Sequence, residues 1–202
     1  MRAHRFGTTG LRAALAMTFL AGCQSSENRV QTDWDGPKTA FVGAQKDYWC
    51  AVAPDRIRVT SELTLQTRPA KAVVMSIRSP CAHAQLEAAA LKGQALDFRK
   101  TGRGMYDVNL PSDKQLKRQR QILFTWLLPV RGLKYESGLY WTRPRSLIPV
   151  VSYELRAGAD PQSGFEVFGA TAENQPVAYS WNFGTPMSEF GGECALPIRP
   201  RK

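Results

Sequence analysis

The chain has 202 residues, a formal net charge of +10 and a hydrophobic fraction of 43%. This length suits one domain and is enough to bury a core without further support. The positive charge favours anionic partners. A membrane-spanning helix needs about 20 apolar residues, and the apolar run near the N-terminus covers only residues 13–22. The sequence therefore excludes a membrane-spanning helix there.

The first 23 residues have the three parts of an export signal. Arg2, Arg5 and Arg12 form a basic beginning, residues 13–20 form a short apolar segment, and small residues precede a cysteine. This order is typical of a cleaved signal peptide. The final tetrapeptide, Leu20-Ala21-Gly22-Cys23, resembles the lipobox of bacterial lipoproteins.

The resemblance implies that Cys23 is acylated, for example with palmitate, and that residues 1–22 are removed. Removal leaves 180 residues and lowers the net charge from +10 to +7, since the segment holds three arginines and no acids. Bacterial lipoproteins typically carry three acyl chains, which is sufficient for stable attachment to a membrane. Gln24 rather than aspartate follows the cysteine, and in enterobacterium-like sorting this implies the outer membrane, with the domain periplasmic or exposed at the surface.

Polarity divides the remaining chain into a tether and a domain. Residues 24–40 are polar, with Trp34 as their one aromatic residue. We expect residues 23–40 to form an acylated N-terminus and a flexible tether. Residues 41–202 then form a single β-rich globular domain.

Alternating apolar and polar residues predict many short strands. In residues 57–65 the apolar positions alternate with arginine, threonine and glutamate, which is typical of a half-buried strand. A second strand is expected at residues 72–78. Later strands are predicted at residues 105–110, 122–128, 139–142, 148–156, 165–170 and 176–183.

One principal helix is expected at about residues 80–92. Ser79 is a suitable N-cap, Pro80 fits the first helical position, and Gly93 supplies a C-terminal stop. Residues 112–115 fit a capping box and predict a further helical turn. The expected fold class is therefore α+β, mainly β, with an antiparallel sheet or sandwich carrying one helix.

Three cysteines remain after acylation: Cys50, Cys81 and Cys194. Export places them in an oxidising compartment, so we expect one disulfide among them. Loop-closure entropy does not select the pair, because every pairing closes a long loop. A bridge using Cys194 is favoured because it would hold the C-terminus.

The sequence contains no recognisable catalytic or metal-binding set. His83 is the one histidine left after cleavage, and on a helix it would point away from Cys81, two residues before it. Zinc-ligand spacings, paired carboxylates on a patterned strand and phosphate-binding glycine loops are absent. We therefore expect no enzyme activity, no cofactor and no metal site.

Aromatic and basic residues are interleaved at Tyr140, Trp141, Arg143 and Arg145. Such a surface can stack on sugar rings and pair with phosphate or carboxylate groups. The alternative is that Trp141 packs inward and the arginines are only solvated. The basic runs at residues 99–103, 114–120 and 199–202 are typical of solvated surfaces.

These observations favour a non-enzymatic, outer-membrane-anchored lipoprotein that acts as a binding or accessory subunit of a cell-envelope assembly. The alternative is a module that binds a glycan or lipopolysaccharide, and a periplasmic hydrolase is a second alternative. The expected partners are the membrane, through the acyl chains, and an envelope protein or an anionic glycan. The location disfavours nucleic acid.

Overall fold

The computed structural model describes residues 34, 38–67, 69, 71–112, 120–168, 177–190 and 192–201. The lipobox with Cys23, most of the expected tether and residues 113–115 of the expected capping box lie outside these ranges. Within them, no helix is long and apolar enough to cross a membrane.

The described residues are mostly β-strand, with one short 3₁₀ turn at Val130–Gly132. The strands are Gly43–Ala53 (β1), Arg56–Leu65 (β2), Val73–Arg78 (β3), Gln85–Leu91 (β4), Gln94–Ala95 (β5), Phe98–Gly102 (β6), Met105–Leu110 (β7), Gln121–Pro129 (β8), Lys134–Glu136 (β9), Leu139–Thr142 (β10), Arg145–Ala159 (β11), Phe165–Val167 (β12), Val177–Glu189 (β13), Cys194–Leu196 (β14) and Ile198–Pro200 (β15).

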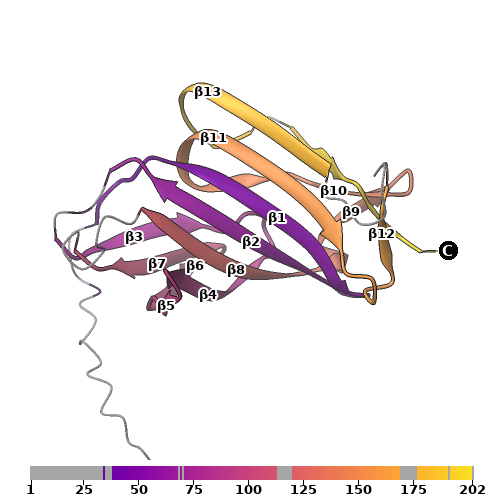
Figure 1. Ribbon diagram of the computed structural model, residues 1–202, viewed down its shortest axis with the longest axis horizontal. Helices are drawn as coiled ribbons and strands as arrows, with labels where there is room; N and C mark the ends of the chain where they lie inside the picture. Colours follow the sequence, from indigo (N-terminus) through magenta and orange to yellow (C-terminus); the bar gives the residue numbers. More distant parts are fainter. Residues whose placement is uncertain are drawn as a thin grey trace, which may run out of the picture. The chain divides into compact units, whose positions relative to one another are not determined.

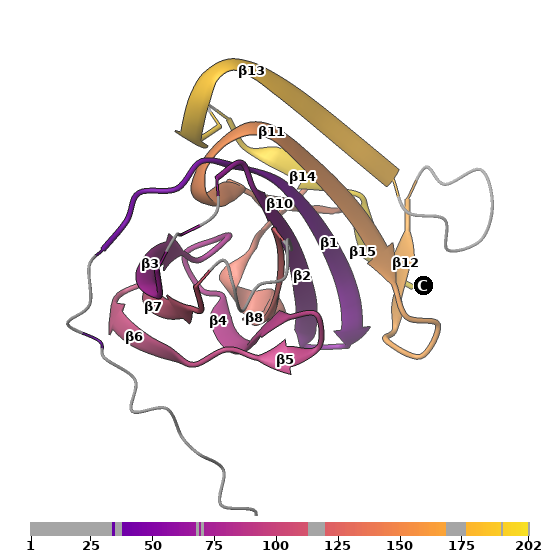
Figure 2. The same ribbon diagram turned by 60° about the vertical axis from the view of Figure 1, so that its left-hand side comes forward.

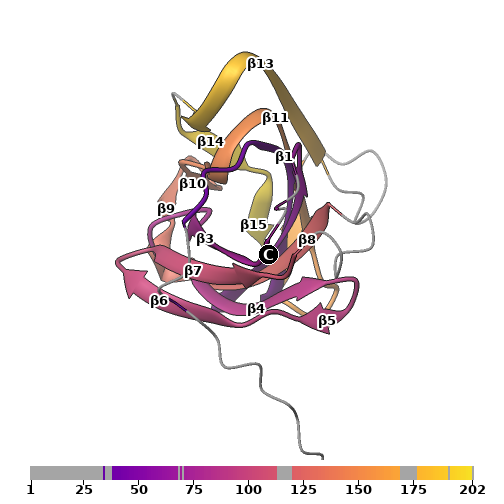
Figure 3. The same cartoon turned by 90° about the vertical axis from the view of Figure 1, so that its left-hand side faces the viewer.

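One large sheet organises the domain. Its seven strands run in the order β13-β11-β1-β2-β8-β4-β5 (Figure 1). Three smaller sheets have the orders β14-β10-β9, β12-β15 and β3-β7-β6. The large sheet curls, and the β3-β7-β6 and β14-β10-β9 sheets lie on its inner side (Figures 2 and 3). The core fills the space that these sheets enclose.

β1 lies near the middle of the large sheet, although its sequence does not alternate between apolar and polar residues. It pairs antiparallel with β2 and parallel with β11. Its buried positions are Gly43, Gln45, Asp47, Trp49 and Ala51, and the residues between them are more exposed. Two of these five inward positions are polar and one is glycine, and this explains why the hydrophobic pattern does not reveal the strand.

The structure confirms a mainly β domain and most of the expected strands. The bounds predicted at residues 105–110 and 139–142 are those of β7 and β10. β2 and β3 differ from their expected ranges by one residue at one end, and β8 differs by one residue at each end. β11 and β13 are longer than expected, because they pair with each other along the upper part of the sheet (Figure 1).

The prediction of a principal helix at residues 80–92 is wrong. Ser79–Ala84 form a turn, in which the Ser79 hydroxyl donates to the Cys81 carbonyl oxygen, and β4 follows. A register shift between Leu86 and Ala88 turns both Leu86 and Ala89 toward the core. This three-residue spacing resembles that of a helix, and pairing with β8 outweighs the helix propensity of alanine and leucine.

The glycine expected to end that helix serves a different turn. Lys92 and Gly93 both have positive φ angles, 54° and 78°, and they join β4 to β5. Two consecutive residues with positive φ match the twist of a tight hairpin. The same glycine signal therefore fits a helix end and a hairpin turn.

Trp126 on β8 lies at the centre of the core and is fully buried. Its ring makes an edge-on contact with Tyr106 of β7, with 5.5 Å between the centroids. The Tyr106 hydroxyl accepts a hydrogen bond from the Leu86 N–H at 3.3 Å. Trp126 thus joins the large sheet to the β3-β7-β6 sheet.

A buried carboxyl group lies on the inner face of β1. The Tyr153 hydroxyl donates to Asp47 Oδ2 at 2.7 Å, and Gln45 Nε2 donates to Oδ1 at 2.8 Å. Ser61 and Trp49 also lie close to the Asp47 carboxyl group. However, neither the Ser61 hydroxyl nor the Trp49 indole N–H has a hydrogen-bond partner of normal geometry among the described residues. Burial raises the pKa of Asp47 to about 6, although its polar neighbours act to lower it.

A second buried carboxylate, Asp107 on β7, has a different environment. It accepts a hydrogen bond from the Ser76 hydroxyl at 2.7 Å and pairs with Lys38 and Arg99, each at 3.4 Å. Burial alone would raise its pKa, but these partners outweigh that effect and lower it. Arg99 also lies over the ring of Trp34 at 4.8 Å, so residues from the expected tether contact the domain.

Candidate ligand-binding pocket

The β9–β10 hairpin forms one wall of a surface pocket. Its turn residues, Ser137 and Gly138, have φ angles of 54° and 81°, which the tight turn requires. Tyr135 on β9 lies opposite Tyr140 on β10, with 4.8 Å between the ring centroids. Tyr135 is 54% exposed, so one face of this aromatic pair is available to solvent.

The opposite wall comes from the paired strands β12 and β15. Phe168 follows β12, and its N–H donates to the Pro197 carbonyl oxygen at 2.7 Å. The guanidinium of Arg199 lies 4.8 Å from the centroid of the Phe168 ring and pairs with Glu166. Phe168 is 49% exposed, so this wall also offers an aromatic side chain to solvent.

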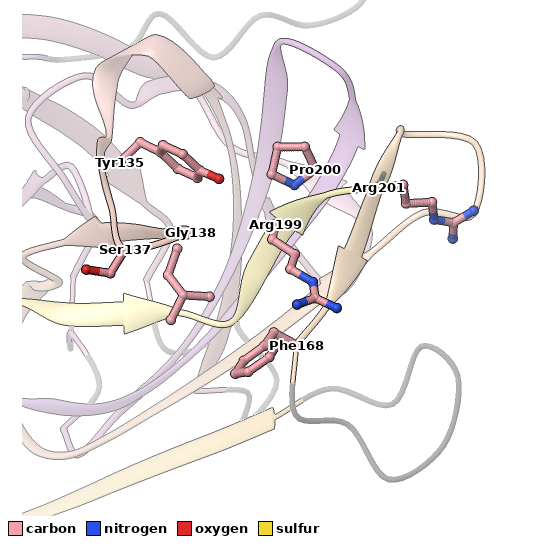
Figure 4. Close-up of a pocket in the computed structure, with 8 residues that line it drawn as sticks. Tyr135, Ser137, Gly138, Phe168, Arg199, Pro200 and Arg201 are labelled. Atoms are coloured by element: carbon pink, nitrogen blue, oxygen red, sulfur yellow. The ribbon is translucent and has the colours of Figure 1, made fainter.

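The space between the walls has a volume of about 340 Å³ (Figure 4). Volumes of this order are at the lower end of those of small-molecule sites. The lining residues are Tyr135, Ser137, Gly138, Leu139, Phe168, Arg199, Pro200 and Arg201. We call this space the aromatic pocket.

The two arginines of the aromatic pocket differ in whether a neighbouring carboxylate compensates their charge. Glu166 offsets the charge of Arg199. Arg201 donates from Nε to the Phe165 carbonyl oxygen at 2.9 Å, and no described carboxylate lies within 4 Å of it. A guanidinium has five N–H donors, so Arg201 retains donors and an uncompensated charge for an anionic ligand.

The residues that the sequence grouped as an anionic-ligand surface do not line this pocket. Tyr140 lies behind Tyr135, and partial burial raises the pKa of its phenol. The Trp141 indole N–H donates to the Glu136 carbonyl oxygen at 3.2 Å. Both aromatic side chains of β10 therefore contact residues of β9, the other strand of the hairpin.

The two arginines of that group separate as well. Arg143 lies 3.5 Å from a carboxylate oxygen of Glu193. Arg145, at the start of β11, lines a different cavity together with Arg78 and Arg103. Sequence proximity therefore groups residues that strand direction and pairing separate.

Sequence analysis missed both exposed aromatic residues of the pocket. Tyr135 precedes the turn of a hairpin whose first strand the sequence does not predict, and Phe168 lies within the strand expected at residues 165–170. Arg199 and Arg201 were noted only as part of a basic tail. Pairing between β12 and β15 brings the tail to Phe168, and no local signal in the sequence contains this pairing.

The three described cysteines are free thiols in the structure. Cys50 is on the outer side of β1, opposite to the buried Trp49. Burial raises the pKa of Cys81 and of Cys194 to about 11 in each case, so both thiols stay protonated at neutral pH. The disulfide expected from export remains a prediction.

Comparison with known proteins identifies no family. No family model matches the chain, and no curated protein matches it. An M1 zinc metallopeptidase from Deinococcus radiodurans has a similar structure, with a TM-score of 0.47 and 12% identity, over 76% of this chain and 41% of that one. An aminopeptidase N family protein from Idiomarina loihiensis gives a TM-score of 0.46 and 9% identity, over 69% and 27%. The chain spans less than half the length of these proteins, and at such values the similarity assigns neither family nor activity.

Proposed function

We propose that this chain is a non-enzymatic, lipid-anchored envelope protein whose β domain binds an anionic glycan in the aromatic pocket. The observation that carries the proposal is the composition of the pocket: exposed aromatic side chains on both walls and a guanidinium without a described carboxylate partner. The lipobox resemblance supports the anchor and the location. The net positive charge supports the preference for an anionic ligand.

The pocket matches the two chemical features of an acidic sugar. The apolar face of a sugar ring packs well against an aromatic ring, as Tyr135 and Phe168 would allow. Carboxylate, phosphate or sulfate substituents accept charge-assisted hydrogen bonds from a guanidinium, and this role falls to Arg201. Arg199, already paired with Glu166, is expected to hold the Phe168 ring in place.

The test measures binding of a heparin hexasaccharide, an anionic probe, and of maltohexaose, its neutral counterpart, by calorimetry. Tyr135→Ala, Phe168→Ala and Arg201→Gln are each expected to weaken heparin binding about tenfold, as loss of a central contact does. Added salt should weaken it further. Maltohexaose should bind more weakly than the anionic probe.

Two exposed residues elsewhere on the domain provide matched controls. Tyr48 on β1 is a partly exposed tyrosine, and Arg58 on β2 is an exposed arginine; neither lines the aromatic pocket. Tyr48→Ala and Arg58→Gln should leave heparin binding unchanged. Equal losses in control and pocket variants would contradict the proposal. If heparin binding weakened only in Arg143→Glu and Arg145→Glu, the binding site would instead be the surface that the sequence predicts.

The anchor has a separate test. Cys23→Ser should leave an unprocessed precursor that incorporates no labelled palmitate in growing cells, because the lipobox cysteine is the acylated residue. Electrophoretic mobility and the label report these two effects. Normal labelling of this variant would remove the basis for the membrane location.

A second candidate function is that of an accessory subunit, and β13 is the observation that favours it. This strand ends the order of the large sheet, and in the described part of the chain no strand pairs with its outer edge. Of its 13 residues only Glu189 is charged. Long edge strands without charges are suited to pairing with another chain. Crosslinking in cells should then capture one dominant envelope protein rather than a glycan.

A further inference from the structure

The geometry points to a second binding site, for a phosphate group, at a cavity lined by three arginines. Arg78 ends β3, Arg103 lies in the turn between β6 and β7, and Arg145 begins β11. All three line one cavity of about 370 Å³, which we call the arginine pocket. Its other lining residues are Ser79, Ala82, Gly104 and Met105. It shares no lining residue with the aromatic pocket.

Backbone hydrogen bonds hold the three segments together. The Ser79 N–H donates to the Gly104 carbonyl oxygen at 2.8 Å, which joins the end of β3 to the β6–β7 turn. The Arg145 N–H donates to the Pro80 carbonyl oxygen at 3.0 Å, which joins the start of β11 to the segment that follows β3. The arginines therefore extend from a backbone frame that exists before any ligand binds.

Gly104 allows the close approach that this frame requires. Its φ is +68°, a conformation that costs other residues energy. A Cβ at this position would lie 2.7 Å from Ser79 Oγ, well inside the usual contact distance. Glycine at residue 104 thus lets the turn that carries Arg103 lie directly against Ser79 without backbone strain or a close side-chain contact.

The positive charge of the arginine pocket is largely uncompensated. Arg78 pairs with Glu189 at 3.2 Å. Among the residues that the structure describes, no carboxylate lies within 4 Å of the Arg103 or Arg145 guanidinium. Guanidinium groups stay charged at every physiological pH. Three of them around one cavity, against one carboxylate, favour an anion between them.

Phosphate fits this arrangement better than a simple carboxylate does. A phosphate monoester presents three terminal oxygens and carries a charge between about −1.5 and −2 at neutral pH. Planar guanidinium groups bind such oxygens through paired hydrogen bonds, as at many phosphate sites. The cavity also has room for the alcohol part of an ester. The site therefore suits a phosphorylated headgroup or free phosphate, which share this chemistry.

The experiment titrates the full chain, purified in detergent, with inorganic phosphate and with glycerol 3-phosphate, and follows binding by calorimetry. Saturable binding is expected for at least one of them. Arg103→Gln and Arg145→Gln should each weaken it by about tenfold or more, because each removes charged hydrogen bonds. Arg145→Lys should weaken it less, since it keeps the charge but loses the paired donors.

The pH dependence supplies a further readout. Binding of glycerol 3-phosphate should strengthen as pH rises from about 5 to about 7.5, because the ester gains its second charge with a pKa of about 6. Sulfate has no ionisation in this range and should show no such change. Tighter binding of the ester than of phosphate would identify a headgroup site, and the reverse would identify a site for free phosphate.

Two results would overturn the inference. One is an absence of saturable binding by either compound. The other is equal binding by Arg103→Gln, Arg145→Gln and the Arg58→Gln control, which alters an exposed arginine on β2 outside the cavity. Thermal melting of each variant shows whether it is folded. Because the two pockets share no residue, failure here leaves the glycan proposal unaffected.

Discussion

Replacing Trp126 by alanine is expected to lower the free energy of unfolding by about 3–5 kcal/mol, a large part of the stability of a domain of this size. The side chain is fully buried and contacts Tyr106 and Phe124. Its removal leaves a cavity between two sheets that no neighbour can fill without moving a strand. Urea denaturation followed by circular dichroism measures the loss.

The same strand provides the controls for this substitution. Leu123 lies on the outer side of β8 and is 44% exposed, so Leu123→Ala should change stability by less than about 0.5 kcal/mol. Trp126→Phe keeps much of the ring volume and removes an indole N–H that has no described hydrogen-bond partner, so its cost should be far smaller than that of alanine. A loss for Trp126→Ala no greater than that for Leu123→Ala would contradict the assigned core.

Asp47→Asn is expected to remove a pH dependence of the free energy of unfolding that amounts to about 3 kcal/mol. Burial raises the pKa of Asp47 from 3.8 to about 6 in the folded chain, and a tenfold change in proton affinity corresponds to about 1.4 kcal/mol. The folded state therefore holds this proton more tightly than the unfolded state does. Its contribution to stability is fully present below pH 3.8 and is lost as pH rises through about 6.

The measurement compares the free energies of unfolding of the wild type and Asp47→Asn from about pH 4 to about pH 7.5. The difference between them should move by about 2–3 kcal/mol in favour of the variant as pH rises over this range, because asparagine has no charge to bury. Asp107→Asn is the matched control. Since the pKa of Asp107 is lowered from 3.8, its contribution to stability is present above that pH and is lost only below it, so the difference between the wild type and Asp107→Asn should stay nearly constant over this range. A constant difference for Asp47→Asn would contradict the expected ionisation.

Local alternation is sufficient to predict strands whose inward residues are apolar. In β2 the buried positions include Ile57, Val59 and Leu63, and the expected range is nearly correct. β1 shows the limit of this reasoning, because Gln45 and Asp47 occupy inward positions in a central strand. The distant partners that satisfy them are the Tyr153 hydroxyl for Asp47 and the Leu147 N–H for Gln45, each more than a hundred residues away in the chain. No local pattern can report such a partner.

The helix prediction failed for a related reason. Residues 85–91 have good helix formers and an apolar spacing of three, but a bulge produces that spacing in a strand. Pairing with β8 makes this segment a strand, and local helix propensity does not take such a distant partner into account.

The aromatic pocket depends even more on distant pairing. The sequence predicts a surface of aromatic residues beside arginines, but the four residues predicted for it are neighbours in the chain. The observed walls come from the β9–β10 hairpin and from the pairing of β12 with β15. A single sequence contains Tyr135, Phe168 and Arg201 without any sign that they meet.

Parallel pairing of β1 with β11 also determines when the domain can form. Asp47 is aligned with Leu155, so one edge of β1 has no partner until β11 is available. A fragment that ends between β8 and β9 would expose that edge together with the inward face of β1, including Trp49. Topologies of such high contact order fold slowly, because long loops must close before the stabilising contacts form. We therefore expect an N-terminal half that ends before β9 not to fold on its own, because β1 lacks there the strand that pairs with one of its two edges in the complete domain.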